Sequence, residues 1–136
     1  MFLNGTAMSG QNGHGAIVGA TFLGPARTAP HYRFLAVRDS FPGLFPVAEG
    51  GASIVGELYE LPEEMLYRSL MPDEPAELEL GVIELDDSQI VNAMHLQPER
   101  LAEGDRVVDI TAIGGFRAYQ AFLAANADLR TTLDLP

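Results

Sequence analysis

Along the chain, residues 54–61, which come after the glycine pair at 50–51, are rich in β-branched, aromatic and aliphatic residues and are predicted to form a strand. Both faces of this segment are largely apolar, one with Val55, Glu57, Tyr59 and Leu61, the other with Ile54, Gly56, Leu58 and Glu60. A strand that is apolar on both faces is covered on two sides, so the pattern predicts an interior strand. Within it, Glu57 is a carboxylate between apolar neighbours, and Gly56 marks a bulge or a close approach of backbone or ligand.

Shorter alternating patterns predict the strands around this segment. They cover residues 31–38, 78–82, 90–96 and 107–110, with a short strand at the start of residues 2–10 and an extended stretch at 21–30. Asp86 and Asp87 are predicted to close a hairpin between residues 78–82 and 90–96. Pro42-Gly43 is a turn signal, so residues 39–46 are predicted to be a loop.

Two segments have the spacing of helices. Residues 62–70 begin with proline and two acids, which suits a first helical turn, and Met65, Leu66 and Leu70 are expected to face the core. Residues 71–77 then form a predicted turn. A last helix is predicted at residues 116–126, where Phe116, Tyr119, Phe122 and Leu123 recur at helical spacing. Residues 11–20 are expected to contain one helical turn around His14.

Strands outnumber helices and the two are interspersed, which predicts an α+β fold. We expect a mixed, curved or barrel-like sheet with two or three helices outside it. The 136 residues are expected to form one domain, with a frayed tail at residues 127–136. No apolar run approaches the ~20 residues of a membrane span, and the first residues lack a basic region, so a cytoplasmic protein is expected.

Composition narrows the possible chemistry. Cysteine is absent, which excludes disulfides and thiolate chemistry, and lysine is absent too, so eight arginines face nineteen acids. The net charge of −11 disfavours binding to nucleic acid or to anionic membranes. An anionic ligand must therefore be held by an arginine or by backbone N–H groups. Three widely spaced histidines make no metal signature, and no cofactor is expected; His31 and His95 are interpreted as structural.

The loop of residues 5–10 is rich in glycine and small side chains, which leaves backbone N–H groups open to a ligand. The spacing alone favours a plain turn over a ligand-binding loop, because a glycine-rich loop is a weak signal.

Four blocks occur in an order that resembles a known fold. They are Gly-Thr-Ala-Met-Ser-Gly at 5–10, Ala-Arg-Thr-Ala-Pro-His-Tyr-Arg at 26–33, Val-Ala-Glu-Gly-Gly at 47–51, and Asp-Ile-Thr-Ala-Ile-Gly-Gly-Phe-Arg-Ala-Tyr at 109–119. The sequence resembles the gamma-glutamylcyclotransferase-like fold, and is most similar to the C-terminal domain of allophanate hydrolase, over residues 1 to about 123. The chain lacks the serine amidase domain of that enzyme, so a separately encoded amidase is an expected partner.

The resemblance implies a site. In the family the loop of Gly5, Thr6, Ala7, Met8, Ser9 and Gly10 cradles a carboxylate. Glu57 matches a glutamate of the allophanate hydrolase-like strand, and burial there should raise its pKa, unless the carboxylate pairs with an arginine. Two departures from the cyclotransferases stand out. Cyclotransferases carry Tyr where this chain has Asn4, and their catalytic glutamate is matched only loosely by Glu74. Glu74 is expected to be an ordinary carboxylate in contact with solvent.

Three further residues complete the predicted site. His14 can give or take a proton near neutral pH, although an exposed loop histidine is an equal alternative. Glu49 and Gly50 are expected to shape the loop beside the pocket. Arg117 is placed to bind a substrate carboxylate or to pair with an acid.

Three functions follow. The first is an enzyme of the allophanate hydrolase-like kind that acts on a carboxylated urea or amide, with Glu57 in the cavity, Glu74 outside it, and His14 or Glu57 protonating the departing nitrogen. The second is a gamma-glutamyl cyclotransferase with Glu74 as its base. The third is a ligand-binding subunit, without activity, of a separate amidase.

Overall fold

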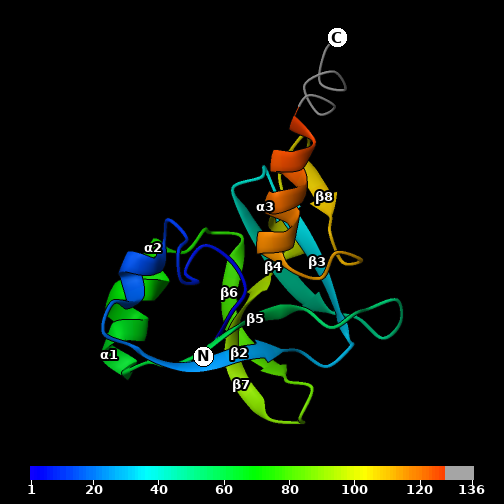
Figure 1. The fold of residues 1–136 in the computed structure, drawn as a ribbon. Helices are drawn as coiled ribbons and strands as arrows, with labels where there is room; N and C mark the ends of the chain where they lie inside the picture. Colours follow the sequence, from blue (N-terminus) through cyan, green and yellow to red (C-terminus); the bar gives the residue numbers. More distant parts are fainter. Residues whose placement is uncertain (128–136) are drawn as a thin grey trace.

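A computed structural model describes residues 1–127 of this chain, so the tail predicted at residues 127–136 lies outside the described residues except for Ala127. The described part contains an eight-stranded mixed sheet, with helices at two sides of it (Figure 1). The strands are β1 (Phe2–Leu3), β2 (Thr21–Arg27), β3 (Tyr32–Val37), β4 (Phe41–Pro46), β5 (Val55–Glu60), β6 (Leu78–Glu84), β7 (Ile90–Leu96) and β8 (Val107–Asp109).

The strand order is β2-β5-β1-β7-β4-β3-β8, and β6 pairs with β7 off this path. The two-residue strand β1 is central: it runs antiparallel to β5 and parallel to β7. β5 lies between β2 and β1, so the prediction of an interior strand at residues 54–61 is confirmed. The hairpin of β6 and β7 is confirmed as well, with Leu78 opposite Leu96 and Glu84 opposite Ile90.

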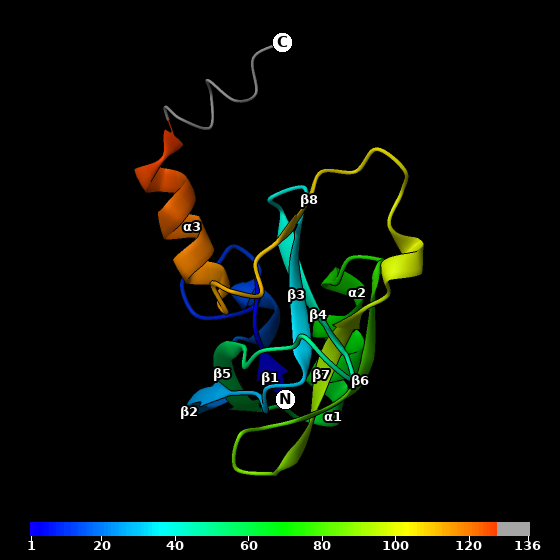
Figure 2. The same cartoon turned by 90° about the vertical axis from the view of Figure 1, so that its right-hand side faces the viewer.

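The helical elements flank this sheet. One helical run joins α1 (Glu63–Met65), the π-helix η2 (Leu66–Leu70) and α2 (Met71–Asp73), and it lies near the 3₁₀ turn η1 (His14–Ile17). α3 (Phe116–Ala125) stands at another side of the molecule, as Figure 2 shows, and a second 3₁₀ turn, η3 (Pro98–Arg100), precedes β8. The predicted α+β class with two outer helical segments is therefore confirmed. Among the described residues, no helix is long and apolar enough to cross a membrane.

The loop predicted at residues 39–46 is wrong, because this segment forms β4, with Ala36 opposite Pro42 and Leu35 opposite Gly43. The turn comes earlier, at Arg38 and Asp39. Their φ angles of 52° and 53° are both positive, as a type I′ hairpin turn requires. Gly43 marks close packing instead of a turn, since a Cβ there would lie 2.6 Å from the Cβ of Leu96.

The first helix also differs from its prediction. It continues through Met71–Asp73, where a turn was expected. The π-helical segment explains this continuation: Met71 donates its N–H to the carbonyl of Leu66, five residues back, and the run then accommodates Pro72. In α3, Phe116 and Tyr119 are buried, whereas Phe122 is 52% exposed and does not belong to the core.

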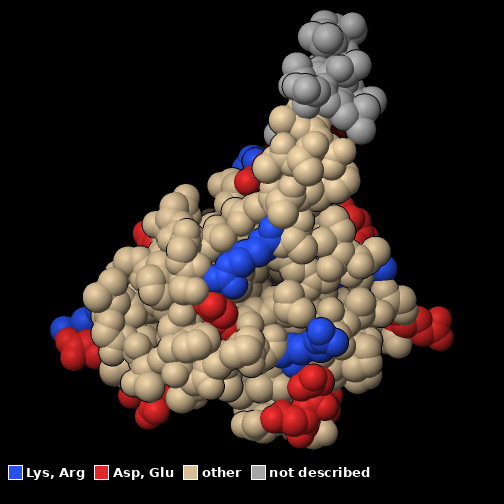
Figure 3. All heavy atoms as spheres, in the orientation of Figure 1, with Lys and Arg blue, Asp and Glu red and all other residues tan. Residues whose placement is uncertain are grey.

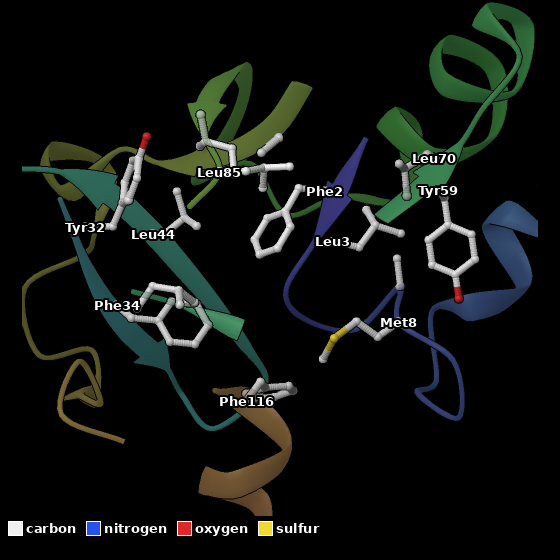
Figure 4. Close-up of a cluster of buried hydrophobic side chains, with 14 of the residues drawn as sticks. Phe2, Leu3, Met8, Tyr32, Phe34, Leu44, Tyr59, Leu70, Leu85 and Phe116 are labelled. Atoms are coloured by element: carbon white, nitrogen blue, oxygen red, sulfur yellow. The ribbon is translucent and has the colours of Figure 1, made fainter. Parts of the chain in front are cut away.

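One large hydrophobic cluster fills the space beneath the sheet, and Figure 4 shows Phe2 and Leu3 of β1 near its middle. Phe34 and Leu44 lie on one side of them, Tyr59 and Leu70 lie on the other, and Phe116 lies below (Figure 4). A smaller cluster of Val37, Phe41 and Leu96 packs between β3, β4 and β7. The central strand thus brings the loop that follows it, residues 4–10, against β5 and α3.

Candidate functional site

Glu57 lies on β5 and is only 6% exposed. The loop after β1 crosses this strand, so that Ser9 donates its backbone N–H to Oε1 of Glu57 (2.7 Å) and its hydroxyl to Oε2 (2.8 Å). Tyr59, two residues along the same face, donates its hydroxyl to Oε1 at 3.1 Å. Three hydrogen-bond donors, two from Ser9 in the loop and one from Tyr59 on β5, therefore hold this carboxylate in place.

Arg117, in the first turn of α3, completes the cluster. Its Nη2 atom lies 3.2 Å from Oε2 of Glu57, 2.6 Å from the carbonyl oxygen of Ser9 and 3.0 Å from Ser9 Oγ. The Arg117 side chain is 47% exposed, so one side of the guanidinium faces outwards. All its hydrogen bonds to the described residues use Nη2, which leaves the Nη1 and Nε donors for a ligand.

The ionisation of Glu57 differs from the prediction. Burial pushes its pKa upwards, but the hydrogen bonds from Ser9 and Tyr59 and the charge of Arg117 together outweigh burial, and the pKa lies below its ordinary value. The expected rise is therefore wrong, and the alternative of a glutamate paired with an arginine is confirmed. Burial and the bond to Glu57 raise the pKa of Tyr59 in turn. An ionised Glu57 orients its neighbours and does not act as a proton donor at neutral pH.

The glycine-rich loop cradles a carboxylate, but that carboxylate is Glu57. Within the loop, the backbone N–H of Met8 donates to the carbonyl of Gly5, and the N–H of Gln11 donates to the carbonyl of Met8. The N–H of Gly13 donates to the carbonyl of Thr6, so residues 5–13 form consecutive turns. The amides of Gln11 and Gln120 donate to each other at 2.9 and 3.0 Å, and this pair fastens the loop to α3 beside Arg117. Binding of a substrate carboxylate by the backbone of residues 5–10 stays a prediction.

His14 lies at the end of the same loop. Its Nδ1 is 2.9 Å from the carbonyl oxygen of Ala7, and because a carbonyl only accepts, Nδ1 carries the hydrogen. Nε2 of the neutral ring then holds a lone pair and can accept a proton. The ring centroid lies 6.0 Å from that of Tyr59, so His14 flanks the Glu57 cluster without bonding to it.

Glu74 occupies a different position from the one expected. It lines a small cavity together with residues of the loop and the first strand, namely Phe2, Leu3, Asn4, Gly5, Thr6, Ala7, Phe41, Pro42, Leu78 and Met94. The cavity volume of about 20 Å³ suffices for about one water molecule. Burial, and then the nearby Asp73, raise the pKa of Glu74 to about 7. The expectation of a solvated carboxylate outside the cavity is therefore wrong, while Glu57 is not among the residues that line it.

The remaining predicted residues lie apart from these groups. Gly50 accepts a hydrogen bond from Arg33 (2.6 Å) and Ala52 bridges to Tyr32, so the loop that contains Glu49 and Gly50 packs against β3. His31 lies 3.9 Å from Glu84 and His95 bonds to the carbonyl of Val82, in keeping with structural roles. Among the described residues, no group of His, Cys, Asp and Glu is arranged to hold a metal ion.

The hydrogen bond from Tyr59 to Glu57 was not predicted from the sequence. Strand alternation, which puts residues 57 and 59 on one face, was the signal that could have identified it. The Gln11–Gln120 pair had no such signal, because its members are 109 residues apart.

On the face of the molecule drawn in Figure 3, a few basic side chains lie among scattered acidic ones.

The sequence matches the family described as the allophanate hydrolase C-terminal domain over residues 1–121. It is 33% identical over 113 residues to a urea amidolyase from Lachancea kluyveri. This match covers 78% of this chain and 6% of the amidolyase. The chain therefore spans only a small part of the curated relative that it matches.

Solved structures show the same arrangement. A protein specific to uropathogenic Escherichia coli superposes with a TM-score of 0.80 at 34% identity, over 88% of this chain and 93% of that one. Allophanate hydrolase from Kluyveromyces lactis gives 0.80 at 26% identity, over 90% of this chain and 21% of that one. An AIG2-like protein from Mus musculus shares the fold alone, with a TM-score of 0.56 at 22% identity over 76% and 78% of the two chains. The predicted gamma-glutamylcyclotransferase-like fold is thereby confirmed.

Proposed function

Because the chain belongs to the allophanate hydrolase C-terminal domain family, we propose that it is a small-molecule enzyme that acts on a carboxylated urea or amide. The Arg117 guanidinium carries this proposal. It is fixed by Ser9 and Glu57 on one side, and its remaining donors are free on the other side among the described residues. Arginine binds carboxylates through paired N–H groups, which suits an N-carboxylate substrate.

In this proposal Glu57 is a positioning residue. Its negative charge keeps Arg117 and Ser9 in one arrangement, so that a substrate carboxylate meets a preorganised cation. Since the Glu57–Arg117 pair is close to neutral as a whole, an incoming anion is not repelled by it. The half-exposed guanidinium supplies binding, and the chemistry requires a further group.

His14 is that group. The protonated imidazole donates its proton from Nε2 to the substrate nitrogen that carries the carboxylate; the N–C bond breaks, its electron pair stays on the nitrogen, and carbon dioxide leaves. The neutral imidazole then takes up a proton from water. The Ala7 carbonyl holds Nδ1–H throughout, which keeps Nε2 as the reacting atom.

The test supplies the carboxylated product of an allophanate hydrolase amidase domain and measures the release of carbon dioxide with and without this protein. We expect His14→Asn to lower kcat by about a hundredfold or more, the usual contribution of a general acid. Arg117→Gln should mainly raise KM. His95→Asn is the matched control and should behave as the wild type. A wild-type rate equal to the spontaneous one would leave a ligand-binding subunit of a separate amidase as the remaining function.

One observation favours a second candidate, a gamma-glutamyl cyclotransferase. Glu74, with a pKa of about 7, faces the cavity formed by residues 4–7, where a base for this reaction is required. A cavity of about 20 Å³ is too small for a γ-glutamyl group, so this function also requires the cavity to widen. Glu57→Gln and Glu74→Gln should be compared on a γ-glutamyl amide and on the carboxylated urea. Loss of γ-glutamyl turnover in Glu74→Gln alone would establish the cyclotransferase in place of our proposal.

A further inference from the structure

A groove on the outer part of the sheet contains an arginine that the site described above does not use. The groove has a volume of about 310 Å³, enough for a ligand of several heavy atoms, and is lined by Pro25, Ala26, Arg27, Val55, Gly56 and Asp86. Within the described part of the chain, the exposed Arg27 side chain makes no ion pair and no hydrogen bond. Its guanidinium donors are therefore open to a ligand that enters the groove.

The backbone that carries Arg27 is firmly held. The next residue, Thr28, is fully buried; its N–H donates to the carbonyl of Ile54 (3.0 Å), and its Oγ1 accepts the N–H of Ile54 (2.9 Å). On the other side, Asp86 donates its N–H to the carbonyl of Arg27 at 2.9 Å. The guanidinium therefore extends from a rigid base, as a binding residue should.

The groove adjoins the Glu57 cluster along β5. Pro25 lies opposite Glu57, and Arg27 lies opposite Val55. Residues that are opposite each other, or two apart on one strand, share a face, so Arg27 and Glu57 lie on the same face, about 7 Å apart along the strands. Val55 also donates its N–H to Gly114 (2.8 Å), which places the groove next to the start of α3 and therefore near Arg117.

We propose that this Arg27 groove is the second half of the substrate site and that Arg27 determines specificity; the inference rests on the proposed function. Arg117 binds the substrate carboxylate, and the Arg27 guanidinium donates to the carbonyl oxygen of the urea or amide at the other end. Asp86 accepts the N–H groups of that same end, and the exposed Val55 packs against its flat face. The groove thus selects ligands that carry both a carboxylate and an amide over simple carboxylates.

The test is an NMR titration of the full chain with N-carbamoylglycine, a stable molecule with a carboxylate and a urea group, and with acetate, which has the carboxylate alone. We expect Arg27→Gln to weaken the binding of N-carbamoylglycine about tenfold, the usual effect of losing hydrogen bonds to a charged group, and to change acetate binding less than about twofold. Arg117→Gln should weaken both ligands. The control is Arg68→Gln, which removes an exposed arginine on the helical run that pairs with Glu64.

The outcomes separate the two proposals. If Arg27→Gln binds N-carbamoylglycine as the wild type does while Arg117→Gln does not, the groove inference is overturned and the proposed function stands. An equal weakening of both ligands by Arg27→Gln, or a similar loss in Arg68→Gln, reports only a change of net charge and also overturns the inference. If Arg117→Gln affects neither ligand, the proposed carboxylate site fails, whatever Arg27 does.

Discussion

Glu57 and Glu74 both lie beside the loop after β1, and their surroundings shift their pKa values in opposite directions. Glu57 is buried but receives hydrogen bonds from Ser9 and Tyr59 and the charge of Arg117, which keep it ionised. Glu74 is half-buried, and within the described residues its carboxyl group makes no hydrogen bond or ion pair, so its neutral form is favoured. Burial alone therefore does not determine the charge of a carboxyl group here; its donors do.

This contrast predicts opposite pH dependences of stability. The pKa of Glu57 is lower in the folded than in the unfolded state, so its contribution is present above about pH 4.5 and is lost as the pH falls through the folded value. Glu57→Gln should lower the free energy of unfolding by roughly 1.5–3 kcal/mol at pH 7, and by less at pH 3.5. Urea denaturation at both pH values measures the difference. A loss that stays constant with pH would contradict the ionised carboxylate.

Glu74 provides the reverse comparison in the same experiment. Its folded pKa of about 7 lies above the ordinary 4.5, so its contribution is present at low pH and is lost as the pH rises through 7. Glu74→Gln should therefore be more stable than the wild type by roughly 2–3 kcal/mol at pH 8.5 and equal to it near pH 4. Destabilisation by this substitution at high pH would show that the carboxylate has a favourable partner there.

At the scale of elements, β4 shows how a glycine can be misinterpreted. Pro42-Gly43 has the composition of a turn, but Gly43 faces β7, where Leu96 and Leu78 leave no room for a side chain. Gly43→Ala is expected to lower the free energy of unfolding by roughly 1–3 kcal/mol through overpacking. Gly15→Ala is the matched control, because a Cβ at that exposed position meets nothing within 4 Å. Thermal unfolding compares them, and equal melting temperatures would contradict the close packing at Gly43.

Most elements were predictable because their signals are local. Alternation identified β3, β6 and β7, apolar residues on both faces identified β5, and helical spacing identified α3. The failures arose where a distant contact overrode a local signal. The hairpin turn at Arg38 and Asp39 lacks the glycine or proline that marks a turn most strongly, and the π-helical segment that extends the first helix through Asp73 has no sequence pattern of its own.

At the scale of the whole molecule, the sheet order is what assembles the site. Glu57 was identified from the sequence as an unusual strand carboxylate, but its partners Ser9 and Arg117 lie 48 and 60 residues away. Such pairings depend on β1 lying between β5 and β7, which no local pattern contains. The resemblance of four blocks to a family supplied the fold, while the direction of the Glu57 pKa shift and the placement of Glu74 needed the structure.

The central place of β1 has a consequence for the order in which the protein folds during synthesis. Phe2 and Leu3 leave the ribosome well before their partners, which are Leu58 and Glu57 of β5 and Ala93 of β7. β1 must therefore wait, unpaired and apolar, until both of these later strands have emerged. Pairings between such distant segments form slowly, and unpaired apolar segments invite association with other chains. The nascent chain is exposed to that hazard until β7 arrives and encloses β1.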